Sequence, residues 1–114
     1  MFKIKRVYKK PDKNDGIRVL VDRLWPRGLK KEEAEIDYWM KETAPSNNLR
    51  KWFAHKEERW QEFKIRYLKE LKEKNDLLKQ LTDLGKDKIV TLLYAAKEEK
   101  RNNAQVLLEV LNKK

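Results

Sequence analysis

Two arginines and a tryptophan follow the second strand-like apolar run of the chain. Residues 19–28 read Val-Leu-Val-Asp-Arg-Leu-Trp-Pro-Arg-Gly, so that Arg23, Trp25 and Arg27 stand between apolar residues and a Pro…Gly turn. The planar guanidinium group matches the geometry of phosphate and carboxylate groups. This arrangement favours an anion-binding site. The alternative interpretation is structural: Arg23 and Arg27 pair with internal carboxylates such as Asp22 or Asp37, and Trp25 packs in the core.

The end of another predicted strand carries further candidates. Tyr94 ends the apolar run 89–94, and Arg-Asn-Asn at 101–103 follows at the start of a predicted helix, whose free N–H groups favour anions. If the two strands are parallel neighbours, their ends meet at the edge where open α/β sheets bind ligands. The arginines would bind the anion there, and the tryptophan would form a wall or stack on a ring. The predicted ligand-binding residues are Asp22, Arg23, Trp25, Arg27, Arg50 and Tyr94.

Two residues are candidates for proton transfer. His55 lies at the predicted end of a short helix, and an unperturbed imidazole titrates near neutrality. A single histidine in such a place more often serves as a cap or hydrogen-bonding residue. Ser46 is the second candidate, but no base is evident near it in the sequence, and it is also well placed as a helix N-cap. The sequence does not decide whether the protein is an enzyme.

The composition excludes several kinds of site. The 114 residues contain no cysteine, which excludes disulfides and thiolate chemistry, and one histidine, which argues against a histidine-based metal site. Three glycines cannot build a glycine-rich phosphate loop. We therefore predict no metal and no cofactor.

The chain is strongly basic, with 29 Lys and Arg against 19 Asp and Glu and a net charge of +10. Such a charge attracts polyanions, so the rival to a small anionic ligand is a nucleic-acid-binding module. The lysines are dispersed among glutamates, which is typical of a solvated surface, and most aromatic residues fall on apolar stripes rather than where bases would stack. No apolar run approaches the length of a membrane span, so we expect a cytoplasmic protein without membrane contacts, and its oligomeric state stays open.

Hydrophobic periodicity predicts one α/β domain over residues 1–114, with a small, mostly parallel sheet flanked by helices. Ser46 is the expected N-cap of the first helix, and Asn102 with Gln105 the capping box of the last. A break at Asn75-Asp76 separates two central helices, and Gly85 ends the second. The expected strands are 2–8, 17–24 and 89–94, with a short extended segment at 36–40, and the expected helices are 49–54, 56–74, 77–84 and a last one from 102.

Five segments together resemble a known bacterial family. They are 21–28 (Val-Asp-Arg-Leu-Trp-Pro-Arg-Gly), 37–46, 49–55 (Leu-Arg-Lys-Trp-Phe-Ala-His), the aromatic stripe 60–71 and 90–96. They are similar to the YeaO-like branch of the domain of unknown function 488 family, and the likeness covers nearly the whole chain. Within this branch the motif positions correspond to Arg23, Trp25, Arg27, Pro45, Ser46, Arg50 and His55.

The resemblance implies an α/β fold with a cleft between two strand ends. In longer relatives an Asp and Arg strand end faces a Cys-His-Arg segment after the last buried strand. The matching region here, 96–103, contains neither Cys nor His, so thiol chemistry does not carry over to this chain. The ends at Asp22-Arg23 and Tyr94 do carry over, as the two sides of the expected cleft.

Overall fold

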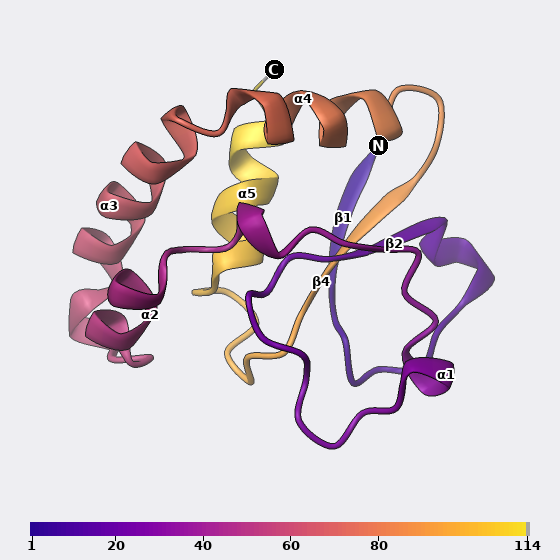
Figure 1. Cartoon of the computed structure of the whole chain (residues 1–114), viewed down its shortest axis with the longest axis horizontal. Helices are drawn as coiled ribbons and strands as arrows, with labels where there is room; N and C mark the ends of the chain where they lie inside the picture. Colours follow the sequence, from indigo (N-terminus) through magenta and orange to yellow (C-terminus); the bar gives the residue numbers. More distant parts are fainter. Residues whose placement is uncertain (114) are drawn as a thin grey trace.

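Four short strands form one sheet in which every neighbouring pair is parallel. The computed structural model describes residues 1–113 and confirms the predicted α/β architecture. Because all strands run in the same direction, their carboxyl ends meet at one edge (Figure 1). The strands lie in the order β1 (Phe2–Arg6), β4 (Val90–Tyr94), β2 (Ile17–Leu20) and β3 (Tyr38–Trp39).

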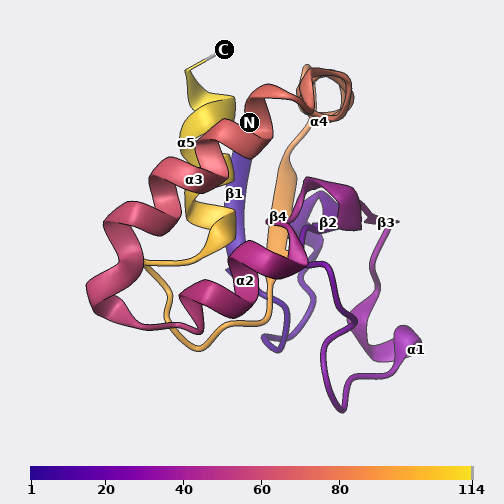
Figure 2. The same cartoon turned by 60° about the vertical axis from the view of Figure 1, so that its left-hand side comes forward.

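The two faces of the sheet are covered differently. The four longer helices pack on one face, and the other face is covered by a smaller apolar cluster from loops around Trp25, Leu29 and Ile36. Figure 2 shows this asymmetry, with α1 (Lys31–Ala34) apart from the other helices. The longer helices are α2 (Asn47–Phe53), α3 (Trp60–Lys72), α4 (Asn75–Leu84) and α5 (Asn103–Asn112), and three short 3-10 helices are η1 (Lys13–Asp15), η2 (Lys41–Thr43) and η3 (Glu57–Arg59).

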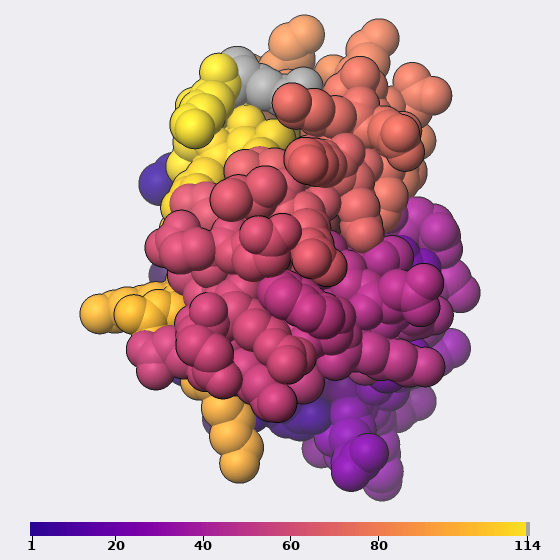
Figure 3. Space-filling model, turned by 90° about the vertical axis from the view of Figure 1, so that its left-hand side faces the viewer, coloured from indigo at the N-terminus to yellow at the C-terminus, as the bar shows by residue number. Residues whose placement is uncertain are grey.

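The central position of β4 in the sheet explains why residues 90–94 are mostly apolar. All five residues of β4 are buried, because β1 and β2 flank it and both of its faces are covered. Side chains of a strand alternate between faces, so that Leu92 joins the helical core and Leu93 joins the smaller cluster. On the helical side, Phe53 of α2 stacks on Phe63 of α3 with ring centroids 4.3 Å apart. Side chains of these two helices form much of the face seen in Figure 3.

Several predicted boundaries shift in the structure. The strand predicted for 17–24 ends at Leu20, because the chain turns toward the neighbouring loop at Asp22. The break between α3 and α4 falls at 73–74 rather than at 75–76. Asn102 is the N-cap of α5 as predicted, accepting a hydrogen bond from the Gln105 amide, but within residues 1–113 the Gln105 side chain does not return the second bond of the predicted capping box. The predicted extended segment is present as β3, which pairs with β2.

A buried ion pair fixes the segment between β1 and β2. Asp15 and Arg18 are each 4% exposed and form a salt bridge, and Lys5 approaches the same carboxylate at 2.9 Å. The Arg18 guanidinium also donates to the Ala34 and Glu35 carbonyls, which ties α1 to β2. Among the described residues no helix has the length and apolarity needed to cross a membrane.

Candidate functional site at the carboxyl edge of the sheet

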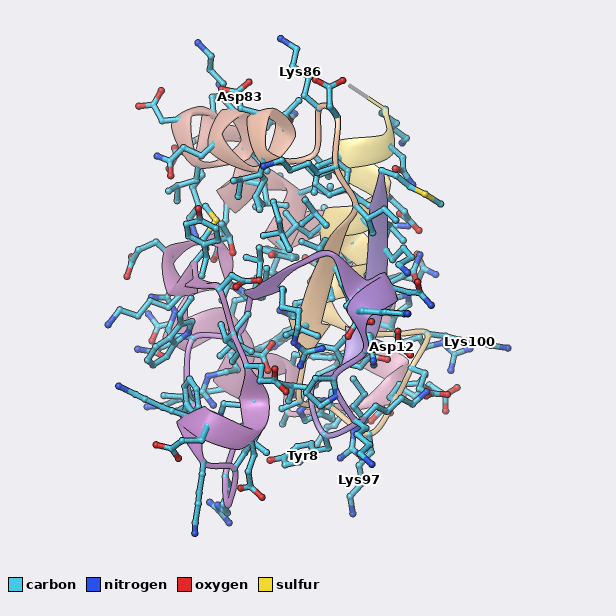
Figure 4. The ribbon with its side chains drawn as sticks, turned by 90° about the vertical axis from the view of Figure 1, so that its right-hand side faces the viewer. Tyr8, Asp12, Asp83, Lys86, Lys97 and Lys100 are labelled. Carbon is cyan, nitrogen blue, oxygen red and sulfur yellow. The ribbon has the colours of Figure 1, made fainter. Side chains whose placement is uncertain are left out.

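A cavity of about 800 Å³ opens at the carboxyl edge of the sheet. This volume lies within the range of about 300–1,000 Å³ that is typical of ligand pockets. Residues that follow β1, β2 and β4 form its floor, and α2 with the start of α3 contributes one wall. Figure 4 shows Tyr8 and Lys97, two of its lining residues, at the end of the molecule opposite Asp83 and Lys86. The cavity is lined by Arg6, Tyr8, Asp22, Arg23, Leu24, Trp25, Pro26, Arg27, Ala44, Pro45, Arg50, Phe53, His55, Phe63, Ala95, Ala96, Lys97, Glu98, Asn102 and Asn103.

Arg23 lines the cavity with a guanidinium held by the backbone. Its Nε donates to the Pro45 carbonyl at 3.1 Å and its Nη2 to the Ala44 carbonyl at 3.2 Å. The nearest carboxylate is the exposed Glu42, 3.8 Å from Nη1. The internal carboxylate partner considered as the alternative is therefore not what orients Arg23. Apart from this ion pair, its remaining N–H groups make no hydrogen bond within residues 1–113, and the two backbone carbonyls hold them in a fixed orientation.

Arg50 presents a buried donor that has no acceptor. Its Nε is shielded from solvent and makes no hydrogen bond within residues 1–113, while Nη2 lies 3.4 Å from Asn47 Oδ1. Leaving a buried donor unsatisfied costs about 1–3 kcal/mol. Such atoms are uncommon in folded proteins, and this one belongs to a side chain that lines the cavity.

Asp22 links the end of β2 to the segment after β4. Its carboxylate accepts hydrogen bonds from the Ala95 amide at 2.9 Å and from Asn103 Nδ2 at 3.1 Å. Burial raises the pKa of this carboxyl group, while these two donors and the nearby His55 act in the opposite direction. The strand ends predicted to converge therefore do so, and Asp22 is the residue that joins them.

Of the other predicted residues, His55, Arg27 and Trp25 line the cavity, whereas Ser46 and Tyr94 do not. His55 lies in the cavity lining with Arg27 and Trp25, so the histidine and the arginines share one site. Trp25 also packs in the smaller apolar cluster, where its Nε1 donates to the Leu29 carbonyl at 2.6 Å and its ring meets Trp39 edge-on at 5.5 Å. Trp25 thus both packs against the smaller apolar cluster and lines the cavity.

Ser46 and Tyr94 are not among the lining residues. The Ser46 hydroxyl donates to Glu70 at 2.7 Å and accepts from the Leu49 amide at 3.2 Å, which makes it the N-cap of α2. Tyr94 is 3% exposed within the core, and burial raises the pKa of its phenol. The structure gives both side chains packing or capping contacts outside the cavity.

The turn that forms the cavity wall at Ala44-Pro45 is held by a network of long side chains. Tyr67 donates to the Thr43 carbonyl at 2.6 Å, and Lys74 donates to the Ala44 carbonyl at 3.0 Å. Burial lowers the pKa of the Lys74 amine, and the neighbouring Glu70 acts against this shift. The network therefore holds the Ala44 carbonyl, one of the two carbonyl groups that orient Arg23.

Arg6, Tyr8 and Lys97 line the cavity but were not predicted from the sequence. Arg6 is the last residue of β1, and its guanidinium lies 4.7 Å from the centre of the Tyr8 ring. Alternation of basic and apolar residues in 2–8 is typical of any half-exposed strand, so it gave no signal for a site. Only the placement of β1 beside β4 brings Arg6 to this edge.

Comparison with known proteins decides the family. A family model described as "Inactive DUF488-N3 subclade" matches residues 1–114. The chain belongs to this subclade. It is 45% identical over 107 residues to "Uncharacterized protein YeaO" of Escherichia coli (strain K12), covering 94% of this chain and 93% of that protein. It is 41% identical over 110 residues to "Uncharacterized protein Rv3073c" of Mycobacterium tuberculosis (strain ATCC 25618 / H37Rv), covering 96% and 92% respectively. No solved structure matches the chain significantly.

The match confirms the resemblance to the YeaO-like branch of the domain of unknown function 488 family. In this member of the DUF488-N3 subclade, the segment 96–103 that borders the cavity contains neither Cys nor His. Within residues 1–113, no group of three or more His, Cys, Asp or Glu side chains is arranged to hold a metal ion. What the cavity offers chemically is a set of cationic donors with two carboxylates, Asp22 and Glu98, and one imidazole.

Proposed function

We propose that this protein binds a small anionic ligand, bearing phosphate or carboxylate groups, in the cavity at the carboxyl edge of the sheet. Arg23, Arg27 and Arg50 bind the anion, and Trp25 forms part of the wall. The observation that carries the proposal is the buried Arg50 Nε, which has no acceptor in the protein and belongs to a cavity-lining side chain. An anion bound to the guanidinium of Arg50 forms charge-assisted hydrogen bonds, which are stronger than neutral ones.

The family description favours a protein that binds its ligand without converting it to a product. The subclade is described as inactive, which agrees with a site built from arginines rather than from a nucleophile. His55 and Asp22 line the same cavity and are the groups that would move a proton if a reaction took place there. The expectation of a cytoplasmic protein stays a prediction.

Thermal unfolding tests the proposal directly. Inorganic phosphate, pyrophosphate, citrate and short oligonucleotides are added at low and moderate salt to the wild type, Arg50→Met and Arg23→Ala, and a ligand that binds the folded state raises the melting temperature. Arg50→Met keeps an unbranched side chain as far as the position of Nε but removes the guanidinium, and with it the unsatisfied donor and the charge. We expect the variant to lose the ligand-induced shift and to equal or exceed the wild type in stability without ligand, by up to about 1–3 kcal/mol.

Arg66→Ala is the matched control for charge. Arg66 pairs with Glu62 at 2.8 Å, stacks on Trp52 and is outside the cavity lining. Its substitution should leave the ligand-induced shift intact. If Arg50→Met and Arg23→Ala both retain the wild-type shift with every anion, the proposed function is wrong. If shifts occur only with oligonucleotides and vanish as salt rises, the nucleic-acid alternative is favoured instead.

A further inference from the structure

We propose that a groove between α3, α4 and α5 binds an acidic amphipathic helix of another protein. The groove has a volume of about 430 Å³ and opens where the second half of α3, the start of α4 and the end of α5 meet (Figure 1). It shares no lining residue with the cavity at the carboxyl edge of the sheet. The proposal is therefore independent of the proposed function.

The floor of the groove is apolar. Leu71 of α3 and Leu78 of α4 are buried there, and Leu68 and Val110 lie half-buried among the lining residues. Ile65 of α3 also lines the groove but is 51% exposed, so that it extends the apolar floor into solvent. Burying this surface against a partner would remove it from water, which is favourable for apolar groups.

α3 carries apolar residues beyond those that the core requires. Phe63, Tyr67 and Leu71 recur every four residues and are buried in the helical core. Ile65 belongs to neither apolar cluster of the described chain, and it lies three residues before Leu68, on the same side of α3. A single exposed apolar side chain is ordinary on a protein surface. This one continues the floor of a groove, which gives it a partner-binding role that an isolated residue would lack.

The polar residues that line the groove are Lys69, Lys72 and Asn75. Within residues 1–113 the ion pairs of α3 are made by Lys64 and Arg66, and neither groove lysine has a hydrogen bond or a salt bridge. Lysines in the last turn of a helix also complement the helix dipole. That role leaves their ammonium groups available to a partner.

The carboxylates of the three helices do not neutralise the two lysines. Glu109 pairs with Lys64 at 2.8 Å, and Glu70 accepts from the N-cap of α2. Glu73 and Asp76 are exposed and are not among the lining residues. The groove thus combines an apolar floor with positive charge and has no carboxylate in its lining, which is complementary to a partner with apolar and acidic side chains.

The surrounding elements favour a helix as the shape of this partner. The groove lies between helices, whose backbone groups are hydrogen-bonded within each helix, so that no sheet edge is offered to an incoming strand. A helix needs only side-chain contacts: apolar residues at i, i+3, i+4 and i+7 fill an apolar groove. Asp or Glu beside this apolar stripe would meet the two lysines.

A second copy of this chain is a less suitable occupant. In a two-fold dimer both copies present the same patch, so that Lys69 and Lys72 of each would enter one interface. Each chain also carries a net charge of +10, and like charges brought together at an interface are unfavourable. An acidic partner is attracted by the same charges.

Selection from a library of displayed random peptides tests the proposal. The peptides are long enough for about four helical turns, and the full chain is the immobilised target. We expect the enriched peptides to carry apolar residues at helical spacing with Asp or Glu beside them. One enriched peptide is then labelled, and fluorescence anisotropy gives its Kd for the wild type and the variants.

Ile65→Ser tests the apolar part of the groove. We expect it to weaken binding of the enriched peptide at least about tenfold, because the side chain that the helix covers is lost. Ile65 is half exposed, so the variant should keep its fold, which its melting temperature checks. Ile89→Ser is the matched control, because Ile89 is 38% exposed and lies outside the groove, and it should leave the Kd unchanged.

A double lysine variant tests the charge. Lys69→Gln combined with Lys72→Gln should weaken the same peptide at least about tenfold. The matched control combines Lys79→Gln with Lys86→Gln, which removes the same charge from exposed positions outside the groove. An equal loss of affinity in the control pair would assign binding to the net charge of the molecule and overturn the proposal.

Three other results would also overturn it. The first is enrichment of no acidic amphipathic peptide. The second is an enriched peptide that binds Ile65→Ser as tightly as the wild type, or that loses affinity in Arg50→Met, which would place it in the cavity. The third is a wild-type dimer in sedimentation velocity that Ile65→Ser converts to a monomer, because the occupant would then be a second copy. Anion binding in the cavity would stand after the first and the third of these results.

Discussion

At the scale of single residues, the cavity is notable for how its arginines are held. Arg6 and Arg23 each donate Nε to backbone carbonyls, so that their orientation is fixed before any ligand arrives. Arg50 differs, because its Nε is buried and lacks an acceptor. For the proposed anion ligand, orienting two arginines in advance would lower the entropy cost of binding, and the unsatisfied donor of the third makes the empty site less stable than one in which that donor is satisfied.

Ser46 provides a residue-scale prediction that separates a structural role from a catalytic one. Its hydroxyl caps α2 and donates to Glu70 outside the cavity. Ser46→Ala should therefore lower the free energy of unfolding by about 0.5–2 kcal/mol. The affinity for an anion that binds the wild type should not change. Urea unfolding and calorimetry measure the two effects, and a loss of affinity with unchanged stability would contradict the capping role.

Asp15 provides a prediction about pH. Burial acts to raise the pKa of this carboxyl group, but hydrogen bonds from Lys5, from the Asp12 amide and from Arg18 together lower it. A carboxyl whose pKa is lower in the folded state favours folding when ionised. Its contribution is present above the unfolded pKa of about 3.9 and is lost as the pH falls through the lower folded value.

Replacing this residue should make the pH dependence visible. Asp15→Asn leaves Arg18 buried without its carboxylate and should cost about 3–5 kcal/mol near neutrality. In urea unfolding, the difference in free energy of unfolding between the wild type and Asp15→Asn should become smaller as the pH falls below about 3.9. Glu109→Gln removes the more exposed pair with Lys64 and should cost about 0–1 kcal/mol. If Asp15→Asn differed from the wild type by the same free energy of unfolding at all pH values, the lowered pKa of Asp15 would be contradicted.

At the scale of elements, the edge of the sheet opposite the cavity depends on a close approach between Gly16 and the backbone of Ile89. Gly16 precedes β2 with φ of +65°, and an added Cβ would collide with the backbone carbonyl of Ile89. That carbonyl accepts the hydrogen bond from the Ile17 amide at 2.9 Å, so β2 and β4 would have to separate. The position thus needs glycine for both its conformation and its lack of a side chain.

A pair of glycine substitutions tests this explanation. Gly28 also has a positive φ, of +77°, but nothing lies within 4 Å of a Cβ added there. Gly28→Ala should therefore cost only the conformational strain, roughly 1–2 kcal/mol. Gly16→Ala should cost this strain plus the displacement of β2, and so lower the melting temperature further. Equal losses for the two variants would show that conformation alone makes glycine necessary at Gly16.

The elements also show how far the sequence alone could lead. Local patterns predicted β4 from its apolar run, the cap of α2 from Ser46, and the convergence of the ends near Asp22 and Tyr94. They could not predict that Arg6 joins the site, because this depends on the pairing of β1 with β4 across more than eighty residues. Nor could they show that the longer helices share one face, since each apolar stripe fits either side of a sheet.

At the scale of the whole molecule, the net charge of +10 attracts any polyanion and must be distinguished from the cavity. Many of the basic residues are lysines on the surface, whereas Arg23 is held by backbone carbonyls and Arg50 has its Nε buried. Interactions among exposed charges are screened by salt, and interactions at partly buried groups are screened much less. The salt dependence of affinity therefore distinguishes binding of a polyanion to the charged surface from binding of a small anion in the cavity.

Titrations at low and moderate salt give the last prediction. A nucleic acid held by six to ten phosphate contacts loses about a thousandfold or more in affinity between roughly 50 and 200 mM salt. A small anion bound by Arg23 and Arg50 should lose far less over the same range, and Arg50→Met should abolish its binding at both concentrations. Fluorescence anisotropy with a labelled oligonucleotide and calorimetry with the anion provide the two curves. Surface charge acts on both the oligonucleotide and the small anion, whereas the buried Arg50 donor acts only on the small anion. If the affinities of both ligands fell equally steeply with salt, all anion binding would be assigned to the surface and none to the cavity.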